Sequence, residues 1–151
     1  MKNKRTHVLL TLGAAFVLCL TLTACSKKAG RKLLDPEIAE MVEADYVGKV
    51  RKIEEDSFSV AEVSFKILED GSLSSSSPSS KKKLEDSELV RVVYHEDTHF
   101  YIRTSPDEGN SYEDTKAGPE SLEEHMQVYM RGDFEGDTFR ATEVRMMQFG
   151  D

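Results

Sequence analysis

The residues best suited to chemistry are two histidines four positions apart, in the string His95-Glu96-Asp97-Thr98-His99. On a helix this spacing puts both imidazoles on one face, where they bind zinc while the glutamate activates a zinc-bound water. Here the string lies between a valine-rich segment and an aromatic one, and Glu-Asp at its centre is typical of a turn. We therefore expect a plain hairpin turn. A zinc-dependent hydrolase, or a weak metal contact between His95 and His99, is the alternative.

Three other polar patterns are better explained by structure than by function. Arg-Gly-Asp at 131–133 matches an adhesion tripeptide but falls where we expect a strand. Asp133, Glu135 and Asp137 crowd one hairpin turn and could touch calcium, although the EF-hand spacing is absent. His125 lies in an acidic turn. Because no nucleophile signature or glycine-rich phosphate loop accompanies these patterns, we predict no catalytic residue and no cofactor.

The first thirty residues have the layout of an export signal. Basic residues within the first five positions precede an apolar run over residues 8–22, which is too short for a comfortable membrane span. The run ends in Leu22-Thr23-Ala24-Cys25, which resembles the lipobox of bacterial lipoproteins. The resemblance implies that the Cys25 thiol is acylated and that residues 1–24 are removed. An ordinary signal peptide and an uncleaved anchor are the alternatives.

Cleavage at this point would define the chemistry of the remaining chain. Cys19 would leave with the signal and Cys25 would carry lipid, so no disulfide is expected. The signal holds three of the 20 basic residues and no acidic one, which leaves 17 basic against 28 acidic residues, or −11. Such a charge repels phosphate backbones, so we expect no nucleic-acid partner. Residues 25–34 form a basic tether that either lies on anionic headgroups or stays solvated.

Residues 35–151 are expected to form one domain, mainly of strands. A helix should begin at Asp35-Pro36, a capping carboxylate followed by a first-turn proline, and end before Tyr46. We expect a bulge near Ala61-Glu62, where the apolar alternation changes phase. Residues 71–86, rich in serine and lysine, should form a flexible loop, and residues 119–125 a helical turn. The expected strands are 46–50, 58–67, 89–94, 100–104, 127–134 and 138–147, with a polar connection over 105–118.

These features favour a small OB-like barrel of bent antiparallel strands with one or two short helices. The opening Gly48-Lys49-Val50 and the closing Phe139-Arg140-Ala141-Thr142-Glu143-Val144 are similar to OB-like domains of unknown function in bacterial envelope proteins. The resemblance covers residues 46–146. The closing hairpin is also similar to that of a periplasmic haem chaperone, but the tail histidine that holds haem in that family has no counterpart after residue 146, so haem carriage is not expected.

Together these patterns predict a membrane-anchored extracytoplasmic lipoprotein. The lipid on Cys25 would hold it at the cell membrane, or at the outer membrane of an organism that has one. We expect a non-catalytic module that binds an envelope protein or a cell-wall polymer. The alternatives are the zinc-dependent hydrolase at His95 and His99 and a small-ligand carrier that uses the barrel mouth.

Overall fold

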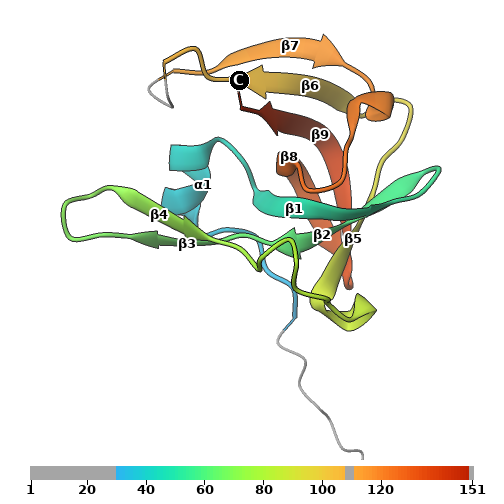
Figure 1. The fold of residues 1–151 in the computed structure, drawn as a ribbon, viewed down its shortest axis with the longest axis horizontal. Helices are drawn as coiled ribbons and strands as arrows, with labels where there is room; N and C mark the ends of the chain where they lie inside the picture. The colour runs from blue at the N-terminus through green and yellow to red at the C-terminus, as the bar shows by residue number, and fades with distance from the viewer. Residues whose placement is uncertain (1–29, 108–110, 150–151) are drawn as a thin grey trace, which may run out of the picture.

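The computed structural model describes residues 30–107 and 111–149, and this part of the chain is built mainly from β-strands (Figure 1). The mainly β prediction is therefore confirmed. The predicted lipobox, Leu22 to Cys25, lies outside the described residues. In chain order the elements are α1 (Pro36–Val42), β1 (Tyr46–Ile53), β2 (Ser57–Glu62), β3 (Ser64–Ile67), β4 (Leu73–Ser76), the 3-10 turn η1 (Asp86–Glu88), β5 (Leu89–Val93), β6 (His99–Thr104), β7 (Glu113–Ala117), the 3-10 turn η2 (Pro119–Ser121), β8 (Gln127–Glu135) and β9 (Thr138–Gln148).

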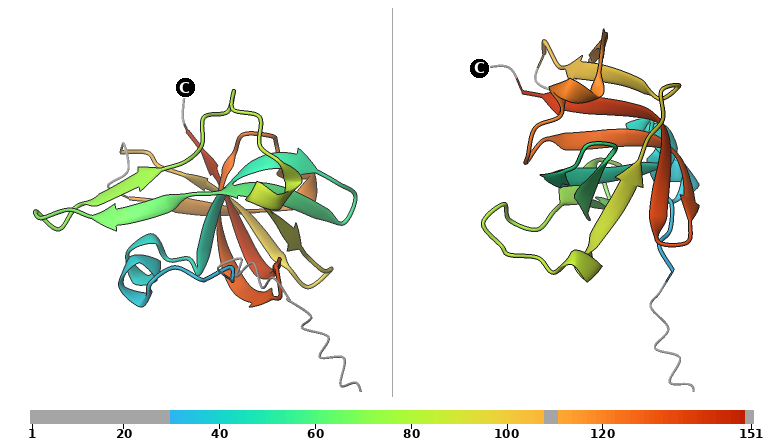
Figure 2. Two further views of the ribbon diagram at one scale, coloured as in Figure 1. Left: turned by 90° about the horizontal axis from the view of Figure 1, so that it is seen from below. Right: turned by 90° about the vertical axis from the view of Figure 1, so that its right-hand side faces the viewer.

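Five of the strands pair with one another in a closed ring. β1 pairs antiparallel with β2 and with β8, β2 pairs with β5, and β8 pairs with β9. The first half of β9 then runs parallel to β5, so that Val92 faces Phe139 across the pair. The second half of β9 runs parallel to β6, whose other edge holds β7. β9 thus joins five strands that pair in a ring to a β6–β7 hairpin (Figure 2).

The inward faces of these strands enclose the main core. Tyr46 packs against Phe134 and Phe139, with ring centroids 5.2 and 5.5 Å apart. Phe139 is fully buried, and Phe58 is fully buried on the opposite strand of the ring. A smaller apolar cluster lies on the other face of β1, where Val47 meets Ala44, Val63 and side chains from α1 and β3. The buried members of the main core are Tyr46, Val50, Phe58, Val60, Val90, Val92, Phe100, Leu122, Val128, Met130, Phe139, Ala141, Val144 and Met146.

The helix forms where the sequence predicts it. Pro36 occupies the first turn, where its missing N–H breaks no hydrogen bond. Asp35 takes the N-cap position, but its side chain makes no capping hydrogen bond. The helix ends at Val42, and the C-cap residue Glu43 has a left-handed backbone (φ 55°) that turns the chain toward β1. The last predicted elements, the helical turn at η2 and the hairpin of β8 and β9, are also present.

The predicted loop over 71–86 is partly a strand. Leu73–Ser76 form β4, which pairs with β3 in a separate two-stranded sheet. The predicted bulge at Ala61-Glu62 is also wrong. Val63 separates β2 from β3, and the register shift lies on the partner strand β1, between Val50 and Lys52. Val63 donates its N–H to the Val47 carbonyl (3.1 Å), which lets β3 leave the main sheet. The phase change in the sequence therefore marks a strand that changes sheets.

Two other expectations fail around the histidines. The segment 95–98 does not close a hairpin, because β5 and β6 do not pair with each other but lie along the same edge of β9. The connection 105–118 contains β7, an edge strand whose side chains are nearly all exposed. Its sequence, Glu-Asp-Thr-Lys-Ala, has no apolar alternation, because only one of its edges is paired and only Ala117 packs against the core.

Candidate binding groove

The two histidines of the zinc-protease string lie in a turn and at a strand end. His95 is exposed, and its N–H is hydrogen-bonded to the Thr98 hydroxyl (2.9 Å). That hydroxyl in turn donates to the Ala141 carbonyl of β9 (2.9 Å), which fixes the turn on the sheet. His99 begins β6. The expectation that this string is not helical is confirmed, so the two imidazoles do not share a helix face.

A hollow of about 670 Å³ surrounds this turn. Glu55 and Asp56, from the turn between β1 and β2, line it together with His95 and His99. Within residues 30–107 and 111–149, no three His, Cys, Asp or Glu side chains are placed to hold a metal ion. His125 lies elsewhere, in a positive-φ turn (φ 74°) before β8. Among the described residues, therefore, no third histidine lies with the zinc-protease string.

The acidic residues at the last hairpin are used within the fold. Arg-Gly-Asp at 131–133 lies inside β8, as predicted, and Gly132 pairs with Ala141 of β9. Glu135 forms an ion pair with Arg140 across the hairpin. Asp137 lies in the turn beside a different hollow. These carboxylates thus project separately rather than converging.

A groove of about 580 Å³ is lined by residues from α1, the β3–β4 hairpin, β6, β8 and β9, and by Tyr112 just before β7. Figure 1 shows where these elements lie. This volume is typical of sites that bind a small ligand or a peptide side chain. Met41 on α1 and Tyr112 are 47% and 48% exposed, a large fraction for apolar residues that line the same hollow. The apolar walls are formed by Met41, Val42, Phe65, Leu73, Tyr112 and Tyr129.

A buried arginine forms the polar floor of the groove. The Arg103 side chain, from β6, is 5% exposed. Its Nε and Nη2 donate to the two carboxylate oxygens of Asp114 (2.7 and 2.8 Å), and Nη2 also donates to Glu43 (3.1 Å). The Arg103 guanidinium carbon lies over the Tyr112 ring, 5.2 Å from the ring centroid. Arg145 forms an ion pair with the same Asp114 oxygen that Nη2 contacts (3.2 Å). The floor is therefore rigid and internally neutralised.

The electrostatics of the floor follow from these contacts. Hydrogen bonds from Arg103 lower the pKa of Asp114, and the charges of Arg103 and Arg145 lower it further against the opposing effect of burial. The same hydrogen bonds raise the pKa of Arg103. Burial raises the pKa of Tyr129, whose hydroxyl accepts a hydrogen bond from Gln127 (2.7 Å). At neutral pH the floor is a fixed arginine–carboxylate pair beneath apolar walls.

Sequence reasoning did not identify any of these groove residues. One residue could have indicated the site. Arg103 follows Phe100, Tyr101 and Ile102 in a predicted strand, and an arginine that is buried there needs a partner for its charge. Its partner, Asp114, lies eleven residues later in a segment that looks like a polar connection. Only the β6–β7 pairing, which places Arg103 opposite Asp114, reveals the pair.

No helix among residues 30–107 and 111–149 is both long and apolar enough to span a membrane. Comparison with known proteins yields no matching family model, no matching curated protein and no matching solved structure. The groove, the charge distribution and the first thirty residues of the sequence are therefore the features of this protein that bear on its function.

Proposed function

We propose that this protein is a lipid-anchored extracytoplasmic lipoprotein whose domain is a non-catalytic binding module for another envelope protein. Acylation of Cys25 would hold it at the cell membrane, or at the outer membrane of an organism that has two. The groove is the observation that carries the binding role. Its exposed Met41 and Tyr112 add apolar surface to an otherwise acidic molecule, and exposed apolar surface of this kind marks interaction sites.

The ring of strand pairings supports a narrower proposal for the fold, a small OB-like barrel. In such barrels five strands pair in a ring. Here β5, β2, β1, β8 and β9 follow one another in that way, and β5 and β9 are the parallel pair that completes the ring. The register shift after Val50 and the one before Gly132 both bend strands, as ring closure requires.

The groove best fits a protein segment with apolar side chains flanked by basic ones. Glu40 borders the groove beside its apolar walls, next to Glu43, which pairs with Arg103. Acidic residues at the rim favour lysine or arginine on the partner, and the −11 charge of the mature chain acts in the same direction. A cell-wall polymer presents mainly hydroxyl groups, which would gain little against Met41, Phe65 and Leu73.

Site-specific crosslinking in living cells tests the proposal. A photoreactive residue at Met41 or at Tyr112 should form an adduct with the same envelope protein, because both side chains face the groove. The same residue at Ile53, which is 39% exposed at the far end of β1, should not. Glu40→Lys should weaken the adduct by reversing charge at the rim. Equal crosslinking at Ile53, or an adduct with a glycan alone, would contradict the proposal.

A further inference from the structure

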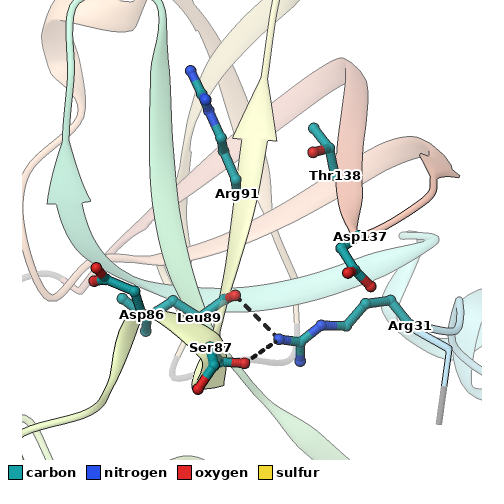
Figure 3. Close-up of a pocket in the computed structure, with 7 residues that line it drawn as sticks. All are labelled: Arg31, Asp86, Ser87, Leu89, Arg91, Asp137 and Thr138. Atoms are coloured by element: carbon teal, nitrogen blue, oxygen red, sulfur yellow. Dashed lines mark hydrogen bonds between the residues drawn. The ribbon is translucent and has the colours of Figure 1, made fainter. Parts of the chain in front are cut away.

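The chain enters the fold at Arg31, directly after the predicted lipid attachment. Its Nη2 donates to the carbonyl oxygens of Ser87 (2.9 Å) and Leu89 (3.1 Å), and Figure 3 shows both bonds. These contacts hold Arg31 at a hollow of about 410 Å³, between η1 and the start of β9. Six residue steps separate Cys25 from Arg31, which is roughly 20 Å when fully extended. A lipid on Cys25 would therefore keep this end of the domain beside the bilayer.

The loop between β4 and η1 lies at the same end. Arg31 shares a second hollow, of about 340 Å³, with both ends of that loop, at Ser77-Pro78 and Leu84. Figure 1 and the right-hand view of Figure 2 show the loop in the half of the molecule where the described chain begins, opposite β6 and β7. The ends of the loop therefore lie near Arg31, whereas the left-hand view of Figure 2 shows its tip on the other side of the molecule from the start of the described chain.

Backbone contacts hold this loop in place. The Arg51 guanidinium, from β1, donates to the carbonyl oxygens of Pro78 (2.9 Å), Ser79 (2.8 Å) and Ser80 (3.0 Å). The Lys82 N–H then donates to the Ser79 carbonyl (2.9 Å), which turns the chain. Lys81 and Lys82 lie in this turn and Lys83 follows it, and all three are exposed. A fixed support for three consecutive lysines is unusual in a segment whose composition predicts a flexible loop.

The charge distribution of the mature chain is strongly uneven. Residues 25–34 hold four basic residues and no acidic one, and residues 77–89 hold three basic and three acidic residues. The remainder holds 10 basic against 25 acidic residues, or −15. One acid of the loop, Glu88, forms an ion pair with Lys82 (3.6 Å), while Glu85 and Asp86 follow the lysines. The tether holds four basic residues and no acid, and the lysine segment has zero net charge, so an anionic surface would repel these parts of the chain less than the remainder.

We propose that Lys81, Lys82 and Lys83, together with Arg31 and Lys32, form a surface that contacts the phosphate groups of anionic phospholipids. We call these five residues the basic end. The inference rests on the proposed lipid anchor, which brings the basic end within reach of the headgroups. Each lysine at such a surface strengthens association roughly fivefold. The contact orients the domain with β6, β7 and the groove away from the bilayer, where a partner protein can reach them.

The test uses the full chain, expressed with its signal, purified from membranes and reconstituted into vesicles. An introduced Ser80→Cys carries a fluorescent dye; it is the one free thiol expected after acylation of Cys25. The vesicles contain a headgroup-attached quencher in either phosphatidylcholine alone or phosphatidylcholine with about a third phosphatidylglycerol, a typical source of anionic surface charge. A dye at Thr115→Cys, exposed on β7, reports the opposite end.

We expect quenching at position 80 to be at least about fivefold greater on anionic vesicles than on neutral ones, and to fall at high salt. Replacing Lys81, Lys82 and Lys83 by Gln should abolish the difference. The matched triple replacement of Lys49, Lys52 and Lys66 should preserve it, and position 115 should stay unquenched on both vesicles.

Equal quenching on both vesicles, or quenching that survives loss of the three lysines, would overturn the proposal while leaving the anchor intact. The intact mass of the purified protein separates the two ideas. An acylated chain with no charge-dependent quenching contradicts only the membrane-facing role of the basic end. A chain without lipid contradicts the proposed anchor, and the inference built on it falls as well.

Discussion

Arg103 and Asp114 are the residues on which the groove most depends. The Arg103 side chain is almost completely buried, so its charge relies on the two oxygens of Asp114 and on the more exposed Glu43. We predict that Asp114→Asn lowers the free energy of unfolding by about 2–4 kcal/mol, because the arginine charge would lose its main partner. Chemical denaturation measures the change. Glu113→Gln, the exposed neighbour on β7, should have almost no effect.

The same pair predicts how this difference varies with pH. The pKa of the Asp114 carboxyl is lowered in the folded state, so its contribution to stability is present above its unfolded pKa and is lost as pH falls through the folded pKa. The gap between the natural chain and Asp114→Asn should therefore shrink below about pH 4. A gap that stays constant down to pH 2 would show that the carboxylate charge is not what stabilises Arg103.

At His95 and His99 we predict weak zinc binding at most, and no zinc-dependent hydrolysis. The histidines lie in a turn and at a strand end, and within the described residues no third ligand converges with them. Titrating zinc while assaying casein and generic peptides tests this directly. Stoichiometric zinc with hydrolysis that is lost in both His95→Ala and His99→Ala would overturn the non-catalytic proposal.

Among the elements, β8 and β9 depend on a glycine at their register shift. Gly132 has φ +150°, and a Cβ added there would lie 2.0 Å from the Arg140 carbonyl oxygen. We predict that Gly132→Ala lowers the free energy of unfolding by at least about 1–2 kcal/mol, because both the backbone and the paired strand must shift. Thermal denaturation measures the loss. Gly30→Ala, with open space around it, is the control and should change stability little.

The aromatic core predicts a larger effect on the same hairpin. Phe139 has no exposed surface and packs against Tyr46 and Phe134. Phe139→Ala should therefore lower the free energy of unfolding by about 3–5 kcal/mol, since it leaves a cavity among rings that cannot close in. Phe149→Ala removes the same group from a site that is 77% exposed and should be nearly neutral. Similar losses in both variants would contradict the assigned core.

The sequence predicts strands in which apolar and polar residues alternate. It does not predict features that depend on contacts between residues distant in the sequence. β5 and β9 are predicted because apolar residues alternate with polar ones along them, as at Val90 and Val92 in β5 and at Phe139 and Ala141 in β9. β7 is missed because an edge strand needs no apolar face. The groove is missed for a related reason: Arg103, Tyr112 and Met41 meet only after parallel pairing brings β6 onto β9, and such non-local pairing leaves no periodic signal.

We propose that the two ends of the domain have different roles. The basic end lies beside the point where the chain enters the fold at Arg31, and the groove lies between α1, β3, β4 and β7. The −15 charge of the chain outside the tether and the 77–89 segment would keep that part away from an anionic bilayer. A lipid anchor, a basic end and an acidic binding groove together would present the groove to envelope proteins close to the membrane.

The intact mass of the protein purified from cell membranes shows whether Cys25 carries a lipid anchor. We predict a chain that begins at Cys25, lacks residues 1–24 and carries added acyl mass on its first residue, whereas Cys25→Ala accumulates as an unlipidated precursor. A chain that keeps its first 24 residues, or one that is cleaved but carries no lipid, would contradict the account.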